Sequence, residues 1–263
     1  MLFYLAHAPI ARGSEMWERL EVEGAPAAEE STLLVCLSTM APQYVPLYSH
    51  ARELAGFLLK NVDSKVLATH YSSSLPAAVT IEQEGVARLY SNQFRAIRGR
   101  KRIIVLSGDG SPFDDQQDFA HSALSFAARL GATEVVSVGA RWAETPAPPG
   151  SPLRPVGYAT DAAGVKELEG YGVAITRGEP GPFFPNLVVG MAPDYGMRGF
   201  KLGVDHGEPL PHPRSVMLIL GVLSKMLGLE VETKALEARA KEMESEGGHG
   251  LPEVGRERSG IYG

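Results

Sequence analysis

The chain has 263 residues, of which 44% are hydrophobic and 21% are charged. These proportions are ordinary for a globular protein and exclude a fibrous or wholly disordered class. The net charge of −6 argues against a nucleic-acid backbone as the main partner, because neutralising phosphates requires a basic surface. The one dense basic run, Arg98 to Arg102, is interpreted as a solvated loop before a strand. The length favours a single α/β domain over two domains.

The cysteine content and the hydropathy of the sequence indicate the cellular compartment of the protein. Cys36 is the only cysteine, so no internal disulfide can form, and its apolar surroundings predict a buried small hydrophobic residue. The first residues lack the basic region of a secretory signal, and no stretch approaches the roughly 20 apolar residues that span a bilayer. We therefore expect a cytoplasmic protein without a membrane anchor.

Apolar runs of strand length alternate with segments of helical period along the chain. Strands that alternate with helices predict a mainly parallel sheet covered by helices on both faces. The unbroken apolar character of 102–108 is typical of a central strand. In chain order, the expected elements are a strand at 32–38, a helix at 48–60, strands at 65–70, 77–83 and 102–108, a helix at 112–130, and strands at 133–140, 172–176 and 186–192.

Helix-capping residues support two of the predicted helices. Ser111 is placed to cap the helix at 112–130, with Pro112 at its first position and Asp114 as a capping-box acid. Gly131 would end it. The same pattern predicts a helix from Pro213 to a stop at Gly228.

A last helix is expected at 234–244, with Leu236, Ala240 and Met243 on one face. Two segments have no such period. Residues 143–155 form a proline-rich loop by composition, and residues 246–263 have the composition of a flexible linker.

The sequence thus predicts one domain over residues 1–245 and a flexible tail over 246–263. Eighteen residues of such a chain span about 25 Å on average and about 60 Å when fully stretched. The tail closes on Ile261, Tyr262 and Gly263. Hydrophobic side chains at the end of a flexible segment suggest a group offered to a partner.

No enzyme motif of high specificity is present. The chain has no GxSxG elbow, no GxxxxGK[ST] loop, no HExxH and no cysteine pair. We therefore predict no catalytic residue, no metal ligand and no cofactor, and the missing phosphate loop predicts independence of ATP.

Two weaker candidates remain open. The turn at 107–112 has two glycines before a predicted helix, where an anion could bind, but it can equally be an ordinary turn containing Asp109. In 203–213, the residues Asp205, His206, Glu208 and His212 could form a metal or acid–base cluster, or simply a polar loop.

Two stretches, 103–140 and 188–244, resemble the proteasome-assembly-chaperone family in its archaeal and bacterial branch. The first is similar to the family's strand, its GD-x-x-P turn, its helix and its following strand; the second is similar to its strand, glycine-containing bend, proline turn and paired C-terminal helices. With a weaker match over 32–100, the resemblance covers nearly the whole body. It implies a three-layer αβα sandwich like that of the nucleoside phosphorylases, with C-terminal helices and a tail.

Two departures from the family are visible. Residues 37–50 contain no glycine where many relatives have a glycine-rich turn, which weakens any inherited anion site. The strand before the proline-rich loop carries only Gly139 where the family usually has a pair of glycines.

The last three residues closely resemble the hydrophobic-Tyr-X tail of proteasome activators, which docks between adjacent α subunits of the 20S ring. By this resemblance, the Gly263 carboxylate pairs with a pocket lysine, the Tyr262 ring is a rigid anchor, and Ile261 buries apolar area. One such tail binds weakly, and several tails on one oligomer bind with useful avidity.

The resemblance therefore implies an archaeal-type, ATP-independent assembly chaperone or activator. Its expected partners are the 20S proteasome α subunits and further copies of itself, as a tetramer or pentamer, with no nucleic acid and no membrane. The alternative is a small-molecule enzyme, phosphorylase- or hydrolase-like, that uses Asp109, His206 and Glu208. An active site would gather these groups in one cleft.

Overall fold

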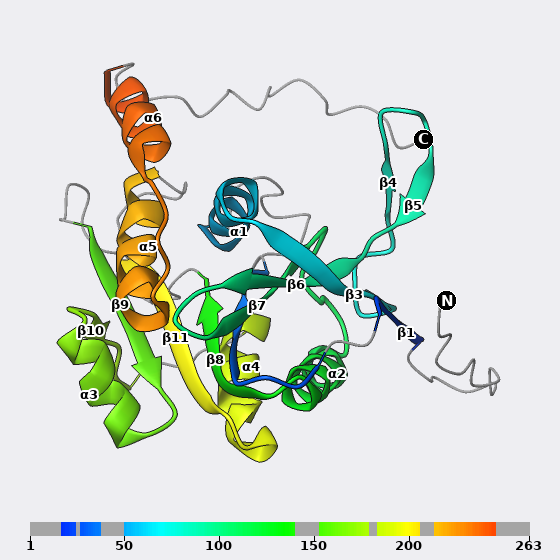
Figure 1. Cartoon of the computed structure of the whole chain (residues 1–263), viewed down its shortest axis with the longest axis horizontal. Helices are drawn as coiled ribbons and strands as arrows, with labels where there is room; N and C mark the ends of the chain where they lie inside the picture. The colour runs from blue at the N-terminus through cyan, green and yellow to red at the C-terminus, as the bar shows by residue number, and fades with distance from the viewer. Residues whose placement is uncertain are drawn as a thin grey trace, which may run out of the picture.

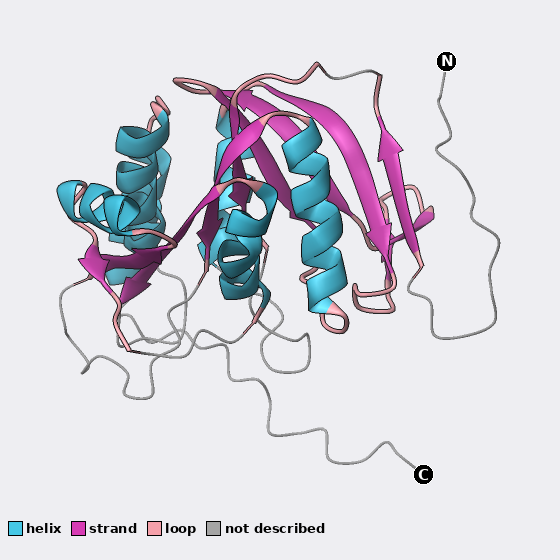
Figure 2. Ribbon diagram, turned by 90° about the horizontal axis from the view of Figure 1, so that it is seen from below, coloured by secondary structure: helices cyan, strands magenta, loops and turns pink. Residues whose placement is uncertain are grey.

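A computed structural model describes residues 17–24, 27–37, 50–139, 153–178, 183–205 and 213–245 of the chain. One nine-stranded sheet runs through these residues in the order β1-β3-β6-β7-β2-β8-β11-β9-β10 (Figures 1 and 2). Its strands are β1 (Glu18–Val22), β2 (Ser31–Val35), β3 (Ser64–Ser72), β6 (Asn92–Arg98), β7 (Arg102–Gly108), β8 (Ala132–Val138), β9 (Arg154–Ala159), β10 (Ala174–Ile175) and β11 (Arg198–Asp205). Two further strands, β4 (Val79–Ile81) and β5 (Ala87–Leu89), form a separate hairpin.

The centre of the sheet is parallel and most of its flanks are antiparallel. Strands β7, β2, β8 and β11 run parallel to one another, as the sequence predicts. On one side, β1, β3 and β6 join antiparallel to the edge of β7, and on the other side β9 pairs antiparallel with β11. Strands β6 and β7 follow each other across a short turn, and such a turn can join only antiparallel strands.

Helices cover both faces of the sheet, which confirms the αβα sandwich (Figure 2). On β2, Leu34 packs on one face, whereas Leu33 and Val35 pack on the other, as the period of two requires. The first face is covered by α1 (His50–Asn61), α3 (Ala162–Gly170), α5 (Pro213–Leu227) and α6 (Lys234–Ser245), and the second by α2 (Gln116–Arg129) and α4 (Phe184–Met191), which runs into the short 3-10 helix η1 (Ala192–Tyr195).

Several predicted elements are confirmed. Strand β7 has the predicted bounds, and α5 and α6 begin at the predicted Pro213 and Lys234. Gly131 and Gly228 both adopt positive φ angles at the helix ends, where a left-handed residue is needed. Cys36 is 2% exposed, as expected for a buried hydrophobic residue.

The predicted strand at 186–192 is wrong, because these residues lie in α4 and its continuation. Phe184, Val188 and Val189 are buried at helical spacing, and α4 packs so tightly on β11 that a Cβ on Gly199 would lie 2.6 Å from the carbonyl oxygen of Val189. The apolar run is therefore one face of a buried helix, which a short stretch cannot distinguish from a strand.

The predicted start of the helix at 112–130 is also wrong. Helix α2 begins at Gln116, and its N-cap is Asp115 in a left-handed conformation. The backbone N–H of Phe113 donates to the carbonyl of Ser74 over 2.7 Å. This contact holds the segment after β7 against the β3 side of the sheet, so Ser111 does not cap the helix.

The sequence interpretation missed β1, β5, β6, β9, β11 and α3, while the strand predicted at 77–83 is β4 of the hairpin. Nearly all of the proline-rich segment and the whole of the tail at 246–263 lie outside the described residues. The boundary between a domain at 1–245 and a tail at 246–263 stays a prediction.

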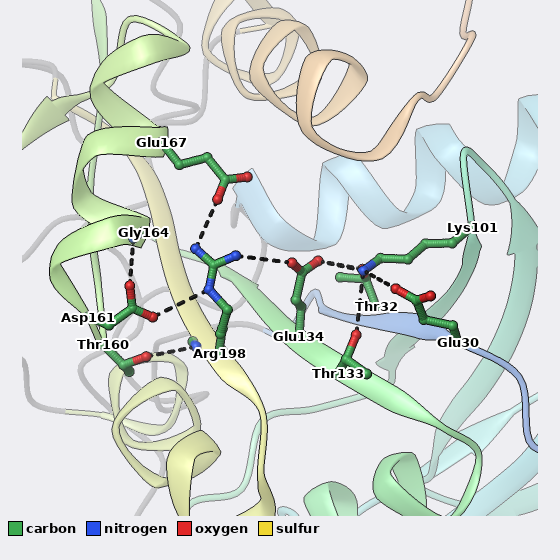
Figure 3. A network of polar contacts seen from close by, with 11 residues as sticks. Glu30, Thr32, Lys101, Thr133, Glu134, Thr160, Asp161, Gly164, Glu167 and Arg198 are labelled. Carbon is green, nitrogen blue, oxygen red and sulfur yellow. Dashed lines mark hydrogen bonds and ion pairs between the residues drawn. The ribbon is translucent and has the colours of Figure 1, made fainter.

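An ionic network joins the amino ends of the central strands (Figure 3). Arg198, at the start of β11, reaches Glu134 of β8 at 3.6 Å, and Asp161 and Glu167 next to and within α3 at 3.3 and 2.9 Å. Glu134 also pairs with Lys101 at 3.0 Å. The backbone N–H of Gly164, followed by Arg198, holds the pKa of the Asp161 carboxyl below its usual range. The network connects β7, β8, β11 and α3.

We expect Arg198→Met to lower the free energy of unfolding by about 1 to 2 kcal/mol, because it leaves three carboxylates close together without their shared cation. Urea unfolding measures this loss, and it should shrink in 1 M salt. The control is Arg177→Met. Arg177 pairs with Glu169 at 3.6 Å, but both side chains are more than half exposed, so its loss should stay within about 0.5 kcal/mol. Equal effects would show that the network contributes no more than a surface pair.

Candidate functional site

The carboxyl ends of β7, β2, β8 and β11 meet at the edge of the sheet opposite the ionic network. In open α/β sheets, ligands bind at this edge, where neighbouring strands connect in opposite directions. Such a reversal occurs at β2, which lies between β7 and β8. The chain continues from β2, β8 and β11 into residues 38–49, 140–152 and 206–212, which are outside the described residues.

Asp109, which directly follows β7, is held by the β4–β5 hairpin. Its carboxylate pairs with Arg88 of β5 and accepts a hydrogen bond of 3.0 Å from the backbone N–H of Ser91. The hydroxyl of Thr80 is 3.5 Å away. The Asp109 oxygens are therefore occupied by hydrogen bonds from Arg88. These hydrogen bonds raise the pKa of the Arg88 guanidinium.

The glycines of this turn serve close packing. A Cβ on Gly108 would lie 2.4 Å from both the Asn92 side-chain oxygen and the Ser91 carbonyl oxygen, so only glycine fits beside β6 at this point. Because α2 begins further on, at Gln116, the turn at 107–112 does not present a helix N-terminus to an anion. The interpretation as an ordinary turn, with Asp109 as a structural residue, describes this segment.

Of the three residues of the enzyme alternative, the structure describes only Asp109, and its carboxylate pairs with Arg88. His206, Glu208 and His212 lie outside the described residues. No observation favours the small-molecule enzyme.

The sequence interpretation missed a buried lysine near the same edge. Lys201 of β11 is 4% exposed, and its ammonium donates to the carbonyl oxygens of Gly139 and Leu202 over 3.1 and 3.0 Å. Its neighbours Phe200 and Leu202 belong to the core on the α5 face, so Lys201 points to the α4 face. Desolvation by burial lowers the pKa of Lys201 from 10.5 to about 7.

Polar residues on the two adjacent strands lie directly opposite Lys201. Ser137 of β8 and Tyr158 of β9 are its Cα partners, and partners across strands point to the same face. The Tyr158 hydroxyl donates to the side-chain oxygen of Asn186 in α4 over 2.8 Å, and burial raises the pKa of Tyr158 to about 12. Lys201 donates to backbone carbonyls where the ladder between β8 and β11 ends, and these hydrogen bonds offset part of the burial of its ammonium.

A strand assignment for 198–205 would have revealed this lysine. In "RGFKLGVD" the apolar side chains alternate with glycine and lysine, and a period of two places Lys201 on the face opposite Phe200, Leu202 and Val204. The glycines and the lysine interrupt the continuous apolar run that is typical of a central strand.

Among the described residues, no group of three His, Cys, Asp or Glu side chains could hold a metal ion. No helix there is long and apolar enough to cross a membrane. The prediction that the chain has no cofactor or metal stays a prediction.

The predicted docking residues Ile261, Tyr262 and Gly263 lie outside the described residues, but the element that precedes them is firmly attached. Helix α6 packs on α5, with Leu236 and Ala240 buried. Arg214 of α5 pairs with Glu244 in the last turn of α6. The segment from 246 onward therefore starts from a fixed point of the body.

Comparisons with known proteins cover most of the chain. The model of the PAC2 family matches residues 34–247. Pyrococcus furiosus PbaB, an archaeal proteasome activator, superposes with a TM-score of 0.72 at 19% identity, over 87% of this chain and 96% of that chain. P. furiosus PbaA, an archaeal homolog of proteasome-assembly chaperone, superposes with a TM-score of 0.68 at 20% identity, over 87% and 89%.

A Mycobacterium tuberculosis proteasome-assembly chaperone homologue superposes with a TM-score of 0.62 at 18% identity, over 86% of this chain and 97% of that chain. At these identities the superpositions establish a shared fold. No curated protein matches the chain.

Replacing Lys201 by Met should change how stability depends on pH. Between about pH 7 and 10.5 the unfolded wild type binds more protons at this lysine than the folded wild type. The free energy of unfolding of the wild type, minus that of the variant, should therefore rise with pH in this window by at most about 1.4 kcal/mol per unit. Below pH 7 both states are protonated, and the difference should be constant.

Urea unfolding of both proteins at several pH values measures this difference, and the subtraction cancels the other titrating groups. Lys234→Met is the matched control, because the Lys234 side chain is 84% exposed, and its curve should stay parallel to the wild type. A Lys201→Met difference that is equally flat would contradict a lowered pKa.

Proposed function

The chain belongs to the PAC2 family, and on that premise we propose that it acts on the 20S proteasome, without ATP, as an assembly chaperone or activator. We propose that the tail residues Ile261, Tyr262 and Gly263 dock into the pockets between adjacent α subunits. The observation that carries the proposal is the family match over 34–247 in a chain that closes on Ile-Tyr-Gly.

The proposed partner agrees with what is known of the structural neighbours. PbaB is described as a proteasome activator, and PbaA and the M. tuberculosis protein as homologues of proteasome-assembly chaperones. All three cover more than four fifths of this chain. We propose that the present chain has the same class of partner and that it acts in the cytoplasm.

The chemistry of the three residues suits a narrow pocket. The Tyr262 ring supplies rigid contact area, Ile261 buries apolar surface, and the carboxylate of Gly263 pairs with a lysine in the pocket. The tail starts from α6, which is fixed on α5. Its 18 residues can extend up to about 60 Å, so the motif can reach a partner while the body stays outside the ring.

A single docked tail gains little free energy after the cost of ordering it. We therefore propose that the protein acts as a homo-oligomer, a tetramer or pentamer, whose several tails bind one ring together. Tethering makes each later tail bind intramolecularly, which raises avidity by orders of magnitude without new contacts.

Deleting Ile261 to Gly263, or replacing Tyr262 by Ala, should weaken binding to purified 20S particles. Truncating a central aromatic anchor costs about 2 kcal/mol, or about 30-fold per tail, and the loss multiplies over several tails. Surface plasmon resonance on immobilised 20S particles measures it. Adding one Ala after Gly263 should do similar damage, because it moves the carboxylate out of register with its lysine.

Glu253→Ala, in the same tail but outside the motif, is the matched control and should bind like the wild type. The melting temperature should be the same for all variants, because the proposed docking role requires no packing of the motif on the body. Truncated and extended chains that bind as well as the wild type would refute the docking proposal. An earlier melting temperature would show that the tail is packed structure.

The oligomer can be tested without the proteasome. Light scattering at micromolar concentration should give a mass of four or five times the 28.2 kDa of one chain. A monomeric mass would remove the avidity on which the proposed affinity depends.

A further inference from the structure

The β4–β5 hairpin exposes one wholly apolar face. The register pairs Val79 with Leu89 and Ile81 with Ala87, and alternation places these four side chains on the same side of the hairpin. Val79 is 51% exposed, Ile81 69% and Leu89 49%. We refer to these four residues as the hairpin face. Figure 1 shows the hairpin projecting beyond β3 and β6.

The opposite side of the hairpin fixes its orientation. Thr80 and Arg88 lie on that side and meet Asp109 of the body. The backbone N–H of Tyr90 also donates to the carbonyl of Ala78 over 3.2 Å at the base. Because these polar contacts hold one side against the body, the hairpin face is directed away from it.

Such a face is costly without a covering group. A hairpin of two short strands is at best marginally stable in water, and it becomes stable when a further strand or another element packs on its apolar side. An apolar face that the fold holds outward is thus typical of a surface that receives another segment.

The chain offers a segment of matching chemistry close to the hairpin. Residues Leu2, Phe3, Tyr4 and Leu5 are consecutive and apolar. They join the described structure at Trp17, which exchanges two hydrogen bonds with Ser73: its N–H donates to the Ser73 hydroxyl over 3.1 Å, and its carbonyl accepts from the Ser73 N–H over 2.9 Å. Ser73 lies only six residues before Val79, where β4 begins.

The connecting length is sufficient. Val79 is six positions after Ser73, so the two are at most about 21 Å apart. Residues 6–16 can extend to roughly 36 Å, and as a flexible linker they would span about 18 Å on average. The apolar segment therefore reaches the hairpin face without strain.

We propose that residues 2–5 pack on the hairpin face of the same chain. A tethered segment of this length acts at an effective concentration near the millimolar range, so a few apolar side chains suffice. A second copy of the chain would instead need an interface of roughly 800 Å² per partner, which four side chains do not provide.

Disulfide formation between engineered cysteines tests this contact in the full chain. The native Cys36 does not interfere, because it is buried and burial raises the pKa of its thiol. The test pair is Ala6→Cys with Ala87→Cys, which places one thiol beside the apolar segment and one on the hairpin face. The matched control pair is Ala6→Cys with Val86→Cys. Val86 is the adjacent residue, is 58% exposed, and lies on the opposite side of the hairpin.

Under mild oxidation, the test pair should form an intramolecular disulfide at least tenfold faster than the control pair. Mass spectrometry of the non-reduced protein identifies the link. Equal rates would overturn the proposal, because they would show that residues 2–5 do not prefer the hairpin face over the opposite side. A disulfide between two chains would also overturn it, since the occupant would then come from a second copy.

Hydrogen exchange provides a second readout that does not depend on the disulfide. Replacing Phe3 and Leu5 by Ser should speed the exchange of the backbone amides of residues 79–89 at least tenfold, and leave the amides of β7 unchanged. Unchanged exchange in the hairpin would refute the contact. Neither experiment involves the proteasome, so the outcome is independent of the proposed function.

Discussion

The burial of the central strands on both faces is the constraint on which the rest of the molecule depends. Strands β2, β7 and β8 contribute Leu34, Ile104 and Val135, all fully buried, to cores on opposite sides of the sheet. Side chains there are mostly apolar, because an unpaired polar group is costly in such surroundings. The ion pairs of Arg198 with Glu134 and of Arg88 with Asp109 lie at the ends of the strands.

The two ends of the strands meet this constraint differently. At the amino end, Arg198 and Glu134 fix the spacing between β8, β11 and α3 by direct ion pairs. At the carboxyl end, the buried ammonium of Lys201 donates to the last carbonyls between β8 and β11, and its burial lowers its pKa. Asp109 is held by Arg88. These charged side chains thus hold the framework together at both ends of the strands.

The sequence predicted those elements whose local pattern and burial agree. Strand β7 is a continuous apolar run. Helix α5 has a proline at its start and a glycine after its end, so its hydrophobic period and its capping residues predict the same helix. The prediction of a strand at 186–192 was wrong because a short apolar run fits a buried helix as well as a strand. Strand β11 and Lys201 were missed because glycines interrupt the apolar run. One of them, Gly199, is needed where α4 packs against the strand. The Arg88–Asp109 pair joins residues 21 positions apart, and no local pattern encodes such a contact.

The proposed docking tail and the hairpin face belong to separate places on the body. The tail follows α6, which packs on α5 over one face of the sheet, whereas the hairpin is attached to β3, β6 and the end of β7. Figure 1 shows α6 and the hairpin on opposite sides of the molecule. Sites that share no contacts contribute nearly additively to stability and binding. The fold can therefore cover the hairpin face with its own N-terminal residues and still present the tail, because neither contact has to be broken for the other to form.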